Sequence, residues 1–139
     1  MIAIIRISGL VDMDEDEEET LFRLRLRRKY ACVVLREKPE LIGMLKKVNN
    51  FVAYGKIDKE MLAELINKRG QVLKGKVDSE AIAKEFFDGK TEKKLSELGI
   101  KDFFRLHPPR KGIKSKIHYP KGVLGNHGEK IKELIRRML

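Results

Sequence analysis

The residues with the clearest chemistry are the cations between Arg105 and Lys121. This stretch carries six Lys or Arg and no Asp or Glu. Its three prolines and Gly112 favour extended or turn backbone over helix. Unpaired cations are costly to bury, so they must face either water or a polyanion. The stretch therefore predicts an exposed basic loop, in which little beyond Ile113 and Ile117 would maintain order before a ligand arrives.

The charge of the whole chain favours the polyanion. The sequence holds 31 Lys or Arg against 21 Asp or Glu, a net charge of +10. The excess is concentrated towards the C-terminus, since residues 101–139 carry 11 Lys or Arg and 3 acids. Such an excess is typical of proteins that neutralise phosphates and release counterions. We therefore expect a nucleic-acid partner.

Catalysis and metal binding find little support in the remaining residue types. The three histidines, His107, His118 and His127, follow none of the spacings of zinc or hydrolase motifs, and Cys32 is the single cysteine. The acidic run Asp12–Glu19 lacks the glycine and alternating ligands of a calcium loop. We interpret it as a solvated loop and helix cap that points away from phosphate, with an acidic metal site as the alternative. No catalytic residue, cofactor, metal ion or small-molecule substrate is predicted.

The first part of the chain predicts alternating strands and helices in one domain. Strands are expected at Ile2–Ser8, Tyr30–Leu35 and Phe51–Gly55, and apolar spacing predicts a helix over Pro39–Val48 with Leu45 and Val48 in the core. In Thr20–Lys29 the alternation of apolar and charged residues fits a strand. The change from preceding acids to cations fits a helix dipole, and we predict helix. This β-α-β-α-β order implies helices on one face of a sheet and an open opposite face.

The second part predicts further helices around the basic loop. Asp58 is expected to cap a helix that Gly70 ends, and extended structure resumes at Lys101–Leu106. Two short helices look like an insertion, and the last helix is amphipathic with apolar residues facing inward. The predicted helices are Lys59–Arg69, Ser79–Phe87, Glu92–Leu98 and Glu129–Leu139.

Cysteine use and hydropathy predict a cytosolic protein. Cys32 lies in an apolar run and reads as a small buried residue in a reducing compartment. The apolar segment Met1–Gly9 is interrupted by Arg6 and lacks a basic leader, so it is not expected to be a signal peptide. No apolar run approaches the ~20 residues that span a membrane, and no membrane partner is expected.

Four ordered blocks resemble one known family. Leu41–Gly55 is similar to the signature segment of the large-ribosomal-subunit protein thirty family. Leu65–Gly70, His107–Gly112 and Leu134–Met138 resemble the extended form of that family in archaea and eukaryotes. The chain lacks the long basic N-terminal extension of the eukaryotic relatives, the large-subunit protein seven, so it resembles the archaeal form.

The resemblance implies a fold and a partner. It implies an α+β fold with a ferredoxin-like core at residues 1–57. The archaeal and eukaryotic type of extension, with its helices and basic loop, then occupies residues 58–139 and packs on the core as one domain. The implied function is binding of large-subunit ribosomal RNA in the neighbourhood of the 5S RNA, beside other ribosomal proteins, in the cytoplasmic ribosome. A free-standing RNA chaperone or regulator of the same fold is the alternative.

The expected RNA contacts combine the charge argument with this resemblance. Lys68 and Arg69 match a Lys-Arg-Gly block of the family, and the alternative for them is a helix end with dipole-favoured cations. His107, His118 and Tyr119 are candidates for stacking or 2′-hydroxyl contacts, with local packing as the alternative. The cations predicted to bind RNA are Arg110, Lys111, Lys114, Lys116, Lys121, Lys68, Arg69, Arg25, Arg27, Arg28, Lys29, Lys46 and Lys47.

Overall fold

A five-stranded sheet forms the centre of the protein. The computed structural model describes residues 1–7, 14–70, 78–88, 100–101, 103–110, 112, 117, 119 and 122–139. The sheet has the order β4-β2-β1-β3-β5, and all neighbours are antiparallel except β3 and β5. Its strands are β1 (Ile2–Arg6), β2 (Ala31–Leu35), β3 (Val52–Lys56), β4 (Phe104–Arg105) and β5 (Gly125–Gly128).

The central strand β1 is buried on both faces. Ile2 and Ile4 pack into a hydrophobic cluster on one face, and Ala3 and Ile5 pack into a second cluster on the other. A strand covered on both sides needs apolar residues at every position and shows no alternation. This is why the continuous apolar run at the start of the chain correctly predicted a buried strand.

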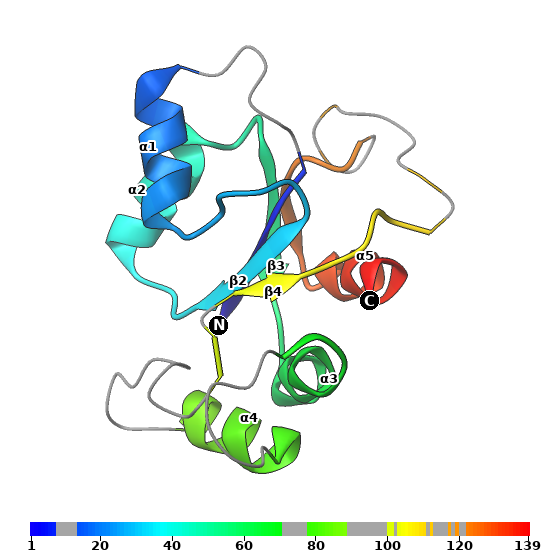
Figure 1. The fold of residues 1–139 in the computed structure, drawn as a ribbon. Coiled ribbons are helices and arrows are strands. Elements are labelled where there is room, and N and C mark those ends of the chain that lie inside the picture. The colour runs from blue at the N-terminus through cyan, green and yellow to red at the C-terminus, as the bar shows by residue number, and fades with distance from the viewer. Residues whose placement is uncertain are drawn as a thin grey trace.

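Helices α1 (Glu15–Arg23) and α2 (Pro39–Lys47) cover one face of the sheet (Figure 1). The predicted second helix is confirmed, with Pro39 in its first turn, where a missing N–H costs nothing. Leu45 and Val48 are buried against this face as predicted. The three strands and two helices of the first part thus form the ferredoxin-like core.

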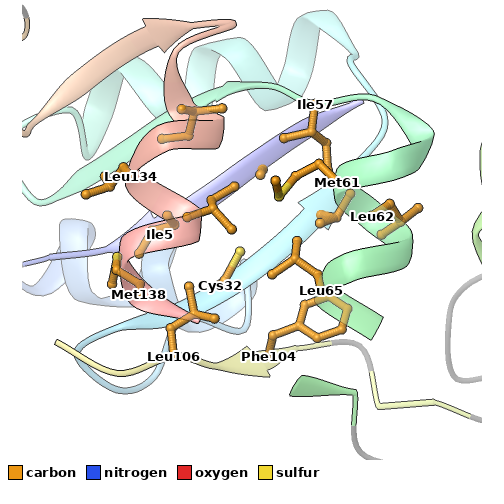
Figure 2. Close-up of a cluster of buried hydrophobic side chains, with 14 of the residues drawn as sticks. Ile5, Cys32, Ile57, Met61, Leu62, Leu65, Phe104, Leu106, Leu134 and Met138 are labelled. Atoms are coloured by element: carbon orange, nitrogen blue, oxygen red, sulfur yellow. The ribbon is translucent and has the colours of Figure 1, made fainter. Parts of the chain in front are cut away.

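Helices α3 (Lys59–Arg69) and α5 (Ile131–Met138) cover the opposite face, so the prediction of an open face was wrong (Figure 1). Figure 2 shows this cluster, in which Cys32 from β2 lies between Leu65 of α3 and Met138 of α5. Burial raises the pKa of the Cys32 thiol to about 12, so it stays protonated and packs as a small apolar group. The cluster contains residues from both sides of position 57. The division of the chain into a core at 1–57 and an extension at 58–139 stays a prediction.

The helix predicted over Thr20–Lys29 is correct at its start and wrong at its end. The acidic run, interpreted as a loop and cap, instead forms the first turns of α1 from Glu15, where carboxylates favour the helix dipole. The helix ends at Arg23, and Arg25 adopts a left-handed φ of 62°. The amides of Arg25 and Leu26 donate back to the carbonyls of Phe22 and Leu21, which is a Schellman ending. After it, Leu24 and Leu26 are buried and Arg25 is exposed, so the period-two pattern was a real signal for this segment.

Strand β5 was not predicted. Its sequence, Gly125–Gly128, contains two glycines with positive φ and no β-branched residue, so composition gives no strand signal. It pairs in parallel with β3 and leads directly into α5, whose predicted apolar face of Ile131, Leu134, Ile135 and Met138 is buried as expected.

The remaining elements follow the predicted order. Asp58 caps α3 by accepting a hydrogen bond from the amide of Met61 (2.9 Å), and Gly70 follows its last residue. Helix α4 (Ser79–Asp88) is confirmed and packs against α3. The helix predicted over 92–98 lies outside the described residues. Within the described ranges, no helix has the length and hydropathy of a membrane span.

Candidate nucleic-acid interface

The turn between α1 and β2, residues 24–30, displays four of the predicted RNA contacts. Arg25, Arg27, Arg28 and Lys29 are all exposed on it. The buried Arg6 of β1 holds this turn through hydrogen bonds. This role was not predicted from the sequence, where Arg6 was treated only as an interruption of an apolar segment. Its Nη1 donates to the carbonyl of Leu26 (2.7 Å), and its own carbonyl accepts from the amide of Tyr30 (2.6 Å).

The burial of Arg6 shows how firmly the turn is held. The residue is 3% exposed, and burial lowers the pKa of its guanidinium, while the charge of Glu18 opposes the shift. An arginine remains charged in proteins, so a buried guanidinium must be compensated by hydrogen bonds or charge. The single cation within the buried strand was the sequence signal for this role.

The start of the basic loop is held by the end of α5. The amide of His107 donates to the carbonyl of Met138 (2.8 Å), and the amide of Arg110 donates to the carbonyl of Arg137 (2.9 Å). The side chain of Arg137 donates to the carbonyls of Arg110 (3.0 Å) and Gly112. These bonds use carbonyls that a helix end leaves without partners. Hydrogen bonds to α5 thus hold the backbone of residues 107–110, while the order of the whole loop before RNA arrives stays a prediction.

The structure brings this loop start next to the turn 24–30. Arg105 pairs with Ala31 across β4 and β2, and the amide of Leu106 donates to the carbonyl of Tyr30 (3.1 Å). Two groups of cations that are about 80 residues apart in the sequence thus share one region of the surface. Of the loop cations, Arg110 is described and exposed. Lys111, Lys114, Lys116 and Lys121 lie outside the described residues.

Lys68 and Arg69 end α3 as predicted. Lys68 lies 3.6 Å from Glu64 one turn earlier, in an exposed ion pair of little energetic weight. The Nε of Arg69 is buried with no hydrogen-bond partner in the described part of the chain. A buried N–H without a partner is costly, so Arg69 stands out among the described cations as one that an added acceptor would stabilise.

Lys46 and Lys47 are exposed at the end of α2. Lys47 lies beside the acidic start of α1: desolvation, Asp14 and its hydrogen bond raise the pKa of Glu17, whereas the charge of Lys47 lowers it. A lysine that already has a carboxylate neighbour gains less from a phosphate. Lys47 is therefore a weaker candidate than the cations of the turn.

For the candidates His107, His118 and Tyr119, the alternatives were contact with RNA and local packing. Tyr119 stacks on His127 with a ring-centroid distance of 4.5 Å, and the Nε2 of His127 donates to the carbonyl of Val123 (2.6 Å). Burial lowers the pKa of His127, while its hydrogen bond to Val123 opposes the shift, and the ring serves local packing. His107 is exposed, and His118 lies outside the described residues.

Two aromatic residues, the exposed Phe22 and the half-buried Phe103, were not identified as candidates from the sequence. Phe22 is 56% exposed, with the guanidinium carbon of Arg27 at 4.1 Å from its ring centroid. Phe103 lies between Lys101 and Arg105, at 5.9 and 5.7 Å from its ring centroid. The spacing Lys-x-Phe-x-Arg just before the loop was an available signal, because alternate residues of a strand share a face.

The fold and the surface together define a small ferredoxin-like α+β protein whose turn 24–30 and loop start display neighbouring cations. Residues 2–52 match the family model of ribosomal protein L30p/L7e. The chain is 44% identical to the large ribosomal subunit protein uL30 of Archaeoglobus fulgidus, over 99% of both chains. It is 39% identical to the protein of that name from Nanoarchaeum equitans, over 100% of this chain and 99% of the relative. With the uL30 of Pyrobaculum aerophilum it shares 36% identity over 99% of this chain and 93% of the relative.

The chain therefore belongs to the ribosomal protein L30p/L7e family and is similar to its archaeal members over nearly its whole length. This confirms the resemblance inferred from the four sequence blocks, the ferredoxin-like fold and the predicted localisation to the large ribosomal subunit. The family is one of structural ribosomal proteins and not of enzymes. Within the described residues, no group of three or more His, Cys, Asp or Glu side chains is arranged to hold a metal ion.

Proposed function

We propose that this protein is a structural constituent of the large ribosomal subunit that binds large-subunit ribosomal RNA. The binding surface consists of the basic loop 105–121, the turn 24–30 and the cationic ends of α2 and α3. Their Lys and Arg side chains neutralise phosphates, and their arginines also make bidentate contacts or stack on bases. No residue has a catalytic role in this proposal.

One observation carries the proposal: the main chain around Arg110 is already held while Arg110 itself is exposed. Hydrogen bonds to α5 hold the loop start, and Leu106 ties it to the turn. Cations displayed from a fixed backbone lose less conformational entropy on binding than cations on a disordered tail. The surface is therefore built for stable residence on a polyanion.

The finer location follows from the family resemblance. We place the protein in the neighbourhood of the 5S RNA, with the acidic start of α1 turned away from phosphate. Asp14, Glu15, Asp16, Glu18 and Glu19 are exposed there. Such a surface would repel RNA and fits a basic ribosomal protein as neighbour.

Footprinting of large-subunit RNA, with and without 5S RNA, tests the proposal. At near-physiological salt the wild-type protein should protect discrete sites. Reversing the charge at Arg110 and Lys111 should remove part of this protection and flatten the dependence of affinity on salt, without changing the melting temperature. Unchanged protection would exclude the loop as a main contact, and no protection that depends on 5S RNA would exclude that neighbourhood.

Sedimentation with ribosomes in high salt separates the two roles considered for this fold. An integral protein stays with the large subunit, because its contacts are many and partly buried. A free-standing chaperone or regulator, held by screened charges alone, washes off. Complete loss at high salt would favour the second role.

A further inference from the structure

The end of α1, the turn 24–30 and the segment 101–105 all combine cations with aromatic rings. Three rings there each have a cation above them: Arg27 on Phe22 (4.1 Å), Lys29 on Tyr30 (5.2 Å), and Lys101 and Arg105 on Phe103 (5.9 and 5.7 Å). Such pairs contribute modestly at exposed sites, so they do not by themselves explain why aromatic residues lie at this surface.

Phe22 is the clearest case of an exposed ring. Its neighbour Leu21 is fully buried, whereas Phe22 is 56% exposed. Three large apolar side chains are exposed in the described part of the chain, and Phe22 is the aromatic one among them. One side of its ring faces the guanidinium of Arg27. Arg and aromatic groups that lie parallel form a platform on which a further planar group can stack.

The backbone that carries these cations is strained at two points. Arg25 and Tyr30 have φ values of 62° and 66°, and they are the two non-glycine residues with positive φ in the described ranges. Left-handed backbone is unfavourable for both side chains, and most of all for a bulky tyrosine. Strain of this kind persists where the surrounding structure holds it, and it clusters at binding sites. Here Arg6 holds the turn from beneath.

Strand β4 extends the same surface from the other side. Arg105 lies directly opposite Ala31 on β2, and Phe103 packs against the hydrophobic cluster that contains Leu24 and Leu26 of the turn. β4 is the last strand of the sheet on this side, and among the described residues no further strand pairs with its outer edge. Lys101 and Arg105 are exposed on either side of the half-buried ring.

We propose that Phe22, Arg27, Lys101, Phe103 and Arg105 form a stacking surface for unpaired RNA bases, in addition to the phosphate contacts that the cations of the loop and the turn make. This inference rests on the proposed function and narrows it to a kind of RNA. A paired duplex keeps its base faces inside, whereas bulges, loops and ends offer them to aromatic rings and guanidinium planes. The surface therefore selects an unpaired segment of RNA beside the phosphates that the loop cations bind.

Substitution of the rings tests the surface with the full chain. Phe22→Ala and Phe103→Ala remove no charge, so phosphate binding remains. Affinity for an RNA hairpin with a bulge of unpaired bases should fall on the order of tenfold for each, while affinity for the fully paired duplex stays unchanged. Ile42→Ala is the matched control, because Ile42 is another exposed apolar residue, on α2.

A fluorescent reporter provides a test that does not require removing an aromatic ring, which could destabilise the fold. The chain contains no Trp, so Phe22→Trp introduces a unique indole, which stacking on a base should quench with bulged RNA and not with duplex. Equal affinity of the Phe22→Ala and wild-type proteins for bulged RNA, or an equal loss for both RNAs, would overturn the stacking surface alone. If wild-type protein bound neither RNA, both this inference and the proposed function would fail. RNA binding unchanged with loss of ribosome incorporation would reassign the surface to a protein partner.

Discussion

Arg110 and Arg137 are joined by a reciprocal pair of hydrogen bonds. The amide of Arg110 donates to the carbonyl of Arg137 at 2.9 Å, and the Nε of Arg137 donates to the carbonyl of Arg110 at 3.0 Å. The same guanidinium also donates to the carbonyl of Gly112. One cation near the end of the chain therefore orders the start of the basic loop, although the sequence separates the two residues by 27 positions.

Removing this guanidinium should weaken RNA binding through the loop. Arg137→Ala is expected to lower RNA affinity more than Arg136→Ala, although each removes one positive charge. Arg137→Lys should not restore the affinity, because an ammonium cannot replace the fork of a guanidinium. Binding titrations and hydrogen exchange at the amides of Arg110 and Gly112 measure both effects. Equal losses for the two alanine variants would show that Arg137 acts by charge alone.

We expect Arg25 to lower the stability of the fold while its side chain contributes to RNA binding. Its left-handed backbone costs roughly 1–2 kcal/mol relative to an ordinary conformation, and glycine avoids most of that cost while adding chain entropy. Arg25→Gly is therefore expected to raise the free energy of unfolding by about 0.5–1 kcal/mol and to lower RNA affinity. Denaturant unfolding and RNA titration check the two effects. Arg28→Gly is the control, since Arg28 has no positive φ and should gain no stability. A destabilised Arg25→Gly protein would refute the strain argument.

Two glycines should respond to alanine in opposite directions. A Cβ on Gly55 would overlap the carbonyl of Gly128 and lie 2.7 Å from the Cβ of Ile131, where β5 and α5 meet β3. Gly55→Ala should therefore cost about 1–3 kcal/mol. Gly43 is exposed in the middle of α2 with open space around it, so Gly43→Ala should add about 0.5–1 kcal/mol. Thermal unfolding of both variants checks this contrast, and a shift in the same direction would contradict it.

Asp58 should make the free energy of unfolding depend on pH in the acidic range. The hydrogen bond from Lys132 (2.6 Å) and the amide of Met61 lower the pKa of the Asp58 carboxyl, while burial opposes the shift. A carboxyl with a lowered folded-state pKa stabilises the fold above its unfolded pKa of ~3.9 and loses that contribution as the pH falls through the folded value.

Asp58→Asn should therefore be less stable than wild type at pH 7, with the difference shrinking below about pH 4. Lys132→Met should reproduce much of this change, because it removes the other partner. Asp58→Ala should lose about 1 kcal/mol more than Asp58→Asn, because asparagine still caps α3. Urea unfolding between pH 7 and pH 2 measures the series. A difference that stays constant over this range would show that the ion pair contributes nothing.

The sequence by itself determined the order of elements in the core and the kind of charge that the surface carries. The apolar run of β1, the helical spacing in α2 and α5, and the cap at Asp58 are local signals, and each led to the right element. The cations at the loop and in the turn were identified by residue type alone, because charge excludes them from the core.

Only the tertiary structure decided which cations lie near one another. The second layer of α3 and α5, strand β5 and the end of α1 all depend on partners far away in the chain, which no local window contains. Arg6 reaches Leu26 across 20 positions, and Tyr30 receives the amide of Leu106. These long-range bonds hold the backbone of the turn in a conformation that local propensity disfavours, and they bring the turn to the start of the basic loop. Residue types reveal what can bind, whereas the positions of the side chains result from cooperative packing.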